Sequence, residues 1–118
     1  MIRPGSELQV YLCREPVDMR KSIDGLSLLV QEALGLNPFE QAVFVFANRQ
    51  RDKVKILFWE RNGFVVWYKR LEQERFKWPR RLEGETIRLS GQELNWLLDG
   101  YDIQLMTLHK ALHYQAVG

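Results

Sequence analysis

An Asn62-Gly63 pair lies between two runs rich in β-branched and aromatic residues, and it constrains the fold more than any other sequence feature. The flanking runs are residues 53–59 and 64–71. Asn-Gly between such runs is the strongest short-range signal for a β-hairpin, because these residues tolerate the positive φ of tight turns. The sequence therefore predicts an antiparallel hairpin, with a loop of either two or four residues.

Three further runs are typical of strands. Residues 8–13 alternate in polarity, residues 42–47 are continuously apolar and β-rich, and residues 86–89 are short enough for an edge strand. Together with the hairpin they predict an antiparallel sheet of about four strands.

Apolar residues at helical spacing predict a first helix on the N-terminal side of the hairpin. The stripe consists of Met19, Ile23, Leu26, Val30 and Ala33. We expect Asp18 to cap this helix, Gly35 to end it, and Gly25 to allow close packing of another backbone.

A second, short helix is predicted after residue 89. Ser90 followed by Glu93 is a capping box, Leu94, Leu97 and Leu98 form an apolar face, and Gly100 closes the helix. The fold class is therefore α+β, with both helices expected on one face of the sheet. The 118 residues suit one domain, with a core at about 8–102 and a tail at 103–118.

The charge of the chain is divided unevenly. The formal net charge is only +2, but residues 49–81 hold eleven basic and four acidic residues, a balance of +7 that leaves −5 for the rest. Such asymmetry is a better indication of partners than the total charge.

Within this basic stretch, Arg49, Arg51, Lys53 and Lys55 occupy alternate positions. If the whole run were extended, they would share one face at intervals of roughly 6.6 Å and could follow a phosphate backbone. Interleaved aromatic residues also suit stacking on single-stranded bases. The alternative is an ordinary solvated sheet face with its aromatic residues in the core.

A second group of cations follows the hairpin, in the segment 76–81, where Pro79 predicts a loop. Such a loop could hold phosphates, or it could be an exposed connection whose Trp78 packs on the core. We predict DNA contacts from both groups and from the second hairpin strand: Arg49, Arg51, Lys53, Lys55, Lys69, Arg70, Arg75, Lys77, Arg80 and Arg81.

No pattern in the chain indicates an enzyme. Phosphate-binding glycine loops and nucleophile-elbow motifs are absent, and Cys13 is the only cysteine. The carboxylates Asp24 and Asp52 are better explained as ion-pair partners than as metal ligands, and His109 and His113 lack a third zinc ligand. We expect no catalysis and no cofactor or metal. Without a signal segment or membrane span, and with one cysteine, the chain is expected to be cytoplasmic.

Four stretches together resemble the TnpB accessory protein of bacterial insertion sequences of group sixty-six. They are Pro16-Val17-Asp18-Met19-Arg20-Lys21 with Ile23-Asp24-Gly25-Leu26; Asn48-Arg49-x-Arg51-Asp52-x-x-Lys55 with Leu57 and Trp59; Asn62-Gly63-Phe64 through Trp67-Tyr68-Lys69-Arg70-Leu71-Glu72 to Arg75-Phe76 and Trp78-Pro79; and Leu89-Ser90 with Glu93-Leu94, Leu97-Leu98 and Gly100.

This resemblance implies a small protein encoded beside a separate transposase and needed for efficient transposition. The strand-cutting chemistry is then assigned to the transposase, so no catalytic residue is carried over. Two roles stay open: DNA contact through the cations above, or an adaptor that docks on the transposase. For the adaptor, the candidate contacts are Asp18, Arg20, Lys21 and Asp24. The sequence leaves the oligomeric state open.

Overall fold

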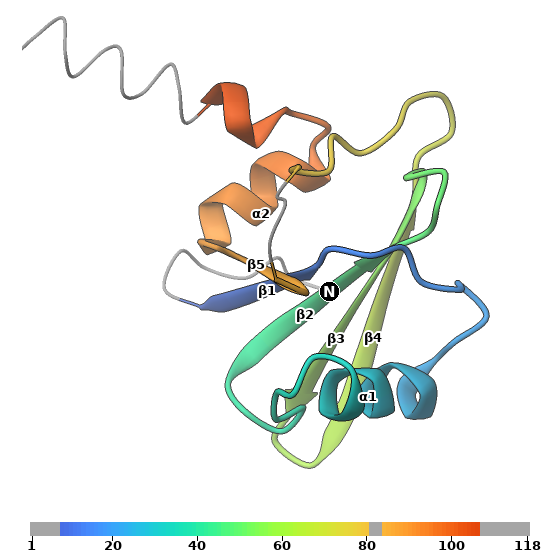
Figure 1. Ribbon diagram of the computed structural model, residues 1–118, viewed down its shortest axis with the longest axis vertical. Helices are drawn as coiled ribbons and strands as arrows, with labels where there is room; N and C mark the ends of the chain where they lie inside the picture. Colours follow the sequence, from blue (N-terminus) through green and yellow to red (C-terminus); the bar gives the residue numbers. More distant parts are fainter. Residues whose placement is uncertain (1–7, 81–83, 107–118) are drawn as a thin grey trace, which may run out of the picture.

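Five strands form one mixed sheet in the order β4-β3-β2-β1-β5 (Figure 1). The computed structural model describes residues 8–80 and 84–106. Its elements are β1 (Gln9–Cys13), α1 (Ile23–Glu32), β2 (Ala42–Ala47), β3 (Lys53–Glu60), β4 (Gly63–Arg70), β5 (Thr86–Leu89) and α2 (Gly91–Leu98). The α+β class is confirmed, with one more strand than the sequence predicts.

One pair of neighbouring strands is parallel. β1 and β2 run side by side in the same direction, with Val10 opposite Val43, because the chain between them crosses over through α1. All other pairs are antiparallel, including the edge strand β5 against β1. The predicted fully antiparallel sheet is therefore corrected at this one pair.

The predicted hairpin is present, and its loop has two residues. Glu60 pairs with Gly63, so Arg61 and Asn62 form the loop and Gly63 begins β4. The positive φ falls on Arg61, at 52°. The Asn-Gly signal thus locates the hairpin correctly, although the left-handed residue precedes the pair.

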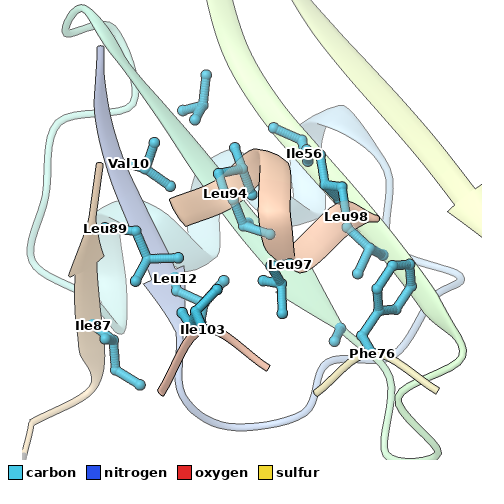
Figure 2. Packing of buried hydrophobic residues seen from close by; sticks show 14 residues of the cluster. Val10, Leu12, Ile56, Phe76, Ile87, Leu89, Leu94, Leu97, Leu98 and Ile103 are labelled. Carbon is cyan, nitrogen blue, oxygen red and sulfur yellow. The ribbon is translucent and has the colours of Figure 1, made fainter. Parts of the chain in front are cut away.

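The two helices lie on opposite faces of the sheet, which corrects the expectation that both cover one face. Successive residues of a strand point to opposite faces. Val43 and Val45 of β2 therefore pack in the cluster that contains α2, while Phe44 and Phe46 pack in the cluster that contains α1. Figure 2 shows the first cluster, with Leu94, Leu97 and Leu98 of α2 against the sheet.

α1 is shorter than its apolar stripe predicts. Leu26 and Val30 are buried, but the helix begins after Ser22, so Asp18 is not its cap. Gly35 has φ +64° just beyond the helix, as expected. A Cβ at Gly25 would lie 3.2 Å from Cβ and Cγ of Lys21, so this glycine accommodates the preceding segment and not another element.

α2 follows its prediction closely. The Ser90 hydroxyl accepts a hydrogen bond from the Glu93 N–H at 3.1 Å, and the Glu93 carboxylate accepts one from the Ser90 N–H at 3.0 Å. Gly100, with φ +94°, follows the helix. Among the described residues, no helix has the length and apolar character needed to cross a bilayer.

Candidate nucleic-acid interface

Three connections meet at one end of the sheet, which we call the basic end: residues 14–21 after β1, 48–52 between β2 and β3, and 71–80 after β4 (Figure 1). They meet there because β1, β2 and β4 all end, and β3 begins, on this side.

Hydrogen bonds join the connections to one another and to the ends of β1 and β2. The Val17 N–H donates to the Ala47 carbonyl at 2.8 Å, and the Phe76 N–H donates to the Arg51 carbonyl at 2.7 Å. The Trp78 indole N–H donates to the Cys13 carbonyl at 3.1 Å. The basic end is therefore a fixed part of the fold, although most of it is loop.

Asn48 organises the turn between β2 and β3. Its side-chain oxygen accepts hydrogen bonds from the N–H groups of Asp52 and Lys53, at 3.2 and 3.1 Å. Its amide nitrogen donates to the Asp52 carboxylate at 2.6 Å, and this bond is the main reason that the pKa of Asp52 lies below its ordinary value. Sequence reasoning did not assign this role to Asn48, which is only 7% exposed.

The turn interrupts the predicted row of cations. β3 begins at Lys53, so Arg49 and Arg51 lie in the turn and only Lys53 and Lys55 share a strand face. Arg51 has φ +61°. Its guanidinium donates to the Arg14 carbonyl at 3.2 Å and lies 5.0 Å from the Trp78 ring centroid, and burial lowers its pKa.

Two lysines of the hairpin bind backbone carbonyls. The Lys55 ammonium donates to the carbonyls of Met19 and Lys21 at 2.8 and 2.7 Å, and the Lys69 ammonium donates to the Leu98 carbonyl at 2.7 Å. With Arg51 they form a set that we call the tied cations, because each bonds a backbone carbonyl. Their hydrogen bonds stabilise the fold before any ligand binds.

Three other cations among the predicted DNA and partner contacts form ion pairs at the surface. Lys53 lies 3.5 Å from the Asp52 carboxylate, and Arg70 lies 3.0 Å from Glu72. Solvent reaches both pairs and screens them, so these charges can exchange partners at little cost.

Arg20 forms the third pair, within the segment predicted to dock on a partner. Its guanidinium lies 2.7 Å from the Asp18 carboxylate, and its hydrogen bonds to that carboxylate hold the pKa of Asp18 at about 2. Lys21 and Asp24 are exposed beside this pair. The four residues of the adaptor prediction are thus neighbours on one short stretch of surface.

Of the ten cations predicted to contact DNA, four are exposed and, within residues 8–80 and 84–106, have neither an ion-pair nor a hydrogen-bond partner on their side chains. We call them the open cations: Arg49, Arg75, Lys77 and Arg80. All four belong to the connections of the basic end. Arg81, the remaining predicted contact, lies outside the described residues.

Two hollows open at the basic end. One, of about 410 Å³, is lined by Pro16, Val17 and Met19 together with Arg49 and Lys53. The other, of about 590 Å³, is lined by Arg51, Lys77, Trp78 and Arg80, with Asp102 at its margin. Each hollow therefore combines an apolar wall with an open cation.

The carboxylates do not converge. Asp18 is bound by Arg20, Asp52 by Asn48, and Asp102 accepts from the backbone N–H of Gln104. In the described part of the chain, no three His, Cys, Asp or Glu side chains lie close enough to hold a metal ion. His109 and His113 lie outside the described residues.

The family model that matches this chain is one of accessory proteins of insertion sequences, and it does not correspond to a known class of enzymes. The chain belongs to the family of IS66 Orf2-like proteins, which matches over residues 8–107.

Two relatives come from Sinorhizobium fredii (strain NBRC 101917 / NGR234). The chain is 36% identical over 102 residues to the uncharacterized protein y4hO, covering 86% of this chain and 88% of the relative. It is 31% identical over 102 residues to the uncharacterized protein y4jC, covering 86% of each. No solved structure matches the chain.

Proposed function

We propose that this insertion-sequence accessory protein contacts DNA through its basic end. The observation that carries the proposal is the grouping of Arg49, Arg75, Lys77 and Arg80 on connections that are bonded to one another, with no partner for their charges in the described chain. Phosphates are the ligands that such exposed cations bind without regard to sequence.

Several features of the basic end support a phosphate-binding surface. Its backbone is held by hydrogen bonds between loops. Binding would therefore cost conformational entropy mainly in the side chains and not in the backbone. Lys53 and Arg70 lie at the same end of the sheet, opposite each other in the β3–β4 register. Their charges add to the positive electrostatic potential of this surface. The described residues present no recognition helix for a groove, and the proposed binding therefore has weak sequence preference.

The test is DNA affinity measured over a salt series. Wild-type affinity is expected to fall linearly on a log–log plot, with a slope of about −0.9 for each phosphate contact. The triple variant Arg75→Ala/Lys77→Ala/Arg80→Ala removes three open cations from one loop. It should bind every sequence more weakly and show a shallower slope.

A matched control is available at the other end of the sheet. Arg61 is exposed at the hairpin loop with φ 52°, a conformation that asparagine tolerates, so Arg61→Asn removes one charge without straining the turn. The slope of log affinity against log salt concentration should be the same for Arg61→Asn as for the wild type. A flat wild-type salt dependence, or equal losses in the Arg61 and loop variants, would contradict the proposal.

A second candidate function is docking on the separately encoded transposase. The hollow lined by Pro16, Val17 and Met19 favours it, because an apolar wall beside the Asp18–Arg20 pair suits a protein side chain. The test is capture of the transposase by nuclease-treated protein. Retention without DNA that is lost in a Met19→Asp variant supports docking, and loss of the transposase on nuclease treatment alone contradicts it.

A further inference from the structure

The outer edge of β4 is open. β4 is the last strand of the sheet, and in the described part of the chain its backbone pairs only with β3. It spans Gly63–Arg70, contains no proline, and has no charged residue before Lys69. Native proteins usually shorten, bend or charge such edges, because an unpaired strand is a template for another strand.

The register shows which groups face outward. The Leu71 N–H donates to the Asp52 carbonyl at 2.8 Å, one step beyond the Lys53–Arg70 pair. Bonded and non-bonded pairs alternate along an antiparallel ladder, so Val65, Trp67 and Lys69 bond β3. The residues that direct N–H and C=O to the open edge are therefore Phe64, Val66, Tyr68 and Arg70.

The opposite edge of the sheet is built differently. β5 has four residues, and the Arg14 N–H donates to the Glu85 carbonyl at 3.0 Å. By the same alternation only Thr86 and Arg88 face outward, and Arg88 is an exposed cation. This edge is short and charged, as expected of an edge that stays unpaired.

We infer that β4 pairs antiparallel with β4 of a second copy of this chain, which joins the two sheets across a two-fold axis. A strand is the only partner that satisfies alternate N–H and C=O groups along the whole edge, and a two-fold axis places the same edge on both sides of the contact.

The sequence of β4 is compatible with itself in this arrangement. With the axis at Trp67, Val66 lies opposite Tyr68 of the second copy and Phe64 lies opposite Arg70 of the second copy. Every outward N–H and C=O from Phe64 to Arg70 then has a partner. On the other face Val65 lies opposite Lys69 of the second copy, so no like charges meet and apolar or aromatic side chains line the centre.

α1 and α2 leave room for this pairing. α1 lies over β3 and β4 on one face, and α2 lies over the region of β1 and β5 on the other (Figure 1). Neither helix is hydrogen-bonded to the outer edge of β4. The inference rests on this edge alone and not on DNA binding, so either can fail without the other.

The first test is the mass of the full-length wild-type protein, measured by light scattering after size-exclusion chromatography over a wide range of concentration. We expect a rise toward twice the 14.0 kDa of one chain. A mass of one chain at every concentration overturns the inference.

Amide hydrogen exchange then locates the contact without any substitution. The N–H groups of Val66 and Tyr68 should exchange slowly in concentrated protein and rapidly after dilution. Those of Val65 and Trp67, which bond β3, should stay slow in both conditions. Rapid exchange at Val66 and Tyr68 in a sample that is dimeric by mass would show that another surface forms the dimer, and would overturn the inference.

Two matched variants separate the edges. Tyr68→Pro removes an outward N–H from β4, and Arg88→Pro removes one from β5; proline is tolerated where the lost N–H faces solvent. After thermal melts confirm folding, Tyr68→Pro should have the mass of one chain and Arg88→Pro should still dimerise. Tyr68→Ala, which keeps the N–H, should dimerise as well. A dimeric Tyr68→Pro would contradict the inference. If Tyr68→Pro does not fold, the hydrogen-exchange measurement on the wild type is the deciding test.

Discussion

The two ends of the β3–β4 hairpin differ sharply in chemistry although the same two strands build both. At the hairpin end, the rings of Phe39, Trp59 and Phe64 pack with centroids 5.0–5.1 Å apart. At the basic end, the same strand face carries Lys53 and Arg70. The hairpin end is thus held by aromatic side chains packing on each other, whereas hydrogen bonds and the buried Phe76 hold the basic end, which keeps charged side chains in solvent.

The cations of this region are of two kinds, and all but one follow their position along the chain: the tied cation Arg51 lies in the turn between β2 and β3. The tied cations Lys55 and Lys69 lie inside strands, where a nearby loop or the C-terminal end of α2 offers backbone carbonyls. The open cations lie in the connections. Lysine and arginine side chains therefore stabilise the fold where they are tied, and remain available to bind a ligand where they are open. Substitutions can separate these two roles.

The largest effect is expected from the residue that anchors the loop of open cations. Phe76 is 2% exposed and packs beside Leu98 in the α2 cluster (Figure 2), between Arg75 and Lys77. Phe76→Ala should lower the free energy of unfolding by about 3–5 kcal/mol, because it leaves a cavity. Chemical denaturation measures this change, and Lys77→Ala should stay within about 0.5 kcal/mol of the wild type. Equal losses in both would show that the loop is not anchored as described.

A smaller loss of stability is expected at a tied cation. Lys55→Met keeps the length of the side chain but removes its bonds to the carbonyls of Met19 and Lys21, and should cost about 2 kcal/mol. The control is Lys53→Met in the same strand, which should lose less stability because the pair of Lys53 with Asp52 is partly in solvent and is screened by it. If Lys55→Met and Lys53→Met lose the same free energy of unfolding, the distinction between tied and surface cations is wrong in β3.

The smallest effect concerns the Asp18–Arg20 pair. The pKa of Asp18 is about 2 when folded and 3.8 without the pair. Because the folded value is the lower one, the pair stabilises the fold above pH 3.8, and this contribution is lost as the pH falls through 2. Arg20→Ala removes the guanidinium but keeps the backbone N–H that donates to Asp18, so the Asp18 titration midpoint, followed by NMR, should rise from about 2 toward 3.8. A midpoint that stays near 2 would assign the shift to another group.

Local features of the fold could be predicted from the sequence. The Asn-Gly hairpin and the Ser90–Glu93 capping box depend on residues within a few positions of one another, and both are present. The parallel β1–β2 pair and the placement of α1 and α2 on opposite faces depend on packing between distant segments, which periodicity within one segment does not reveal.

The cations show the same division. The sequence locates the basic stretch, but it does not show that Lys55 and Arg51 bond carbonyls 34 or more residues away. Carbonyl groups are present at every residue, so composition carries no sign of such bonds. The role of Asn48 escapes sequence reasoning for a related reason, since two of the four hydrogen bonds of its side chain are made with backbone N–H groups of the turn.

The assembly of the basic end from three separated connections has a consequence for the timing of folding. The Trp78–Cys13 bond joins residues 65 positions apart, and such long-range contacts form late and cooperatively. An unfolded or partly synthesised chain carries the same charges in the same order but lacks the surface. During translation, the basic end can be completed only after residue 80 has left the ribosome, so a chain truncated earlier would lack Arg80 and the arrangement of the cations that remain.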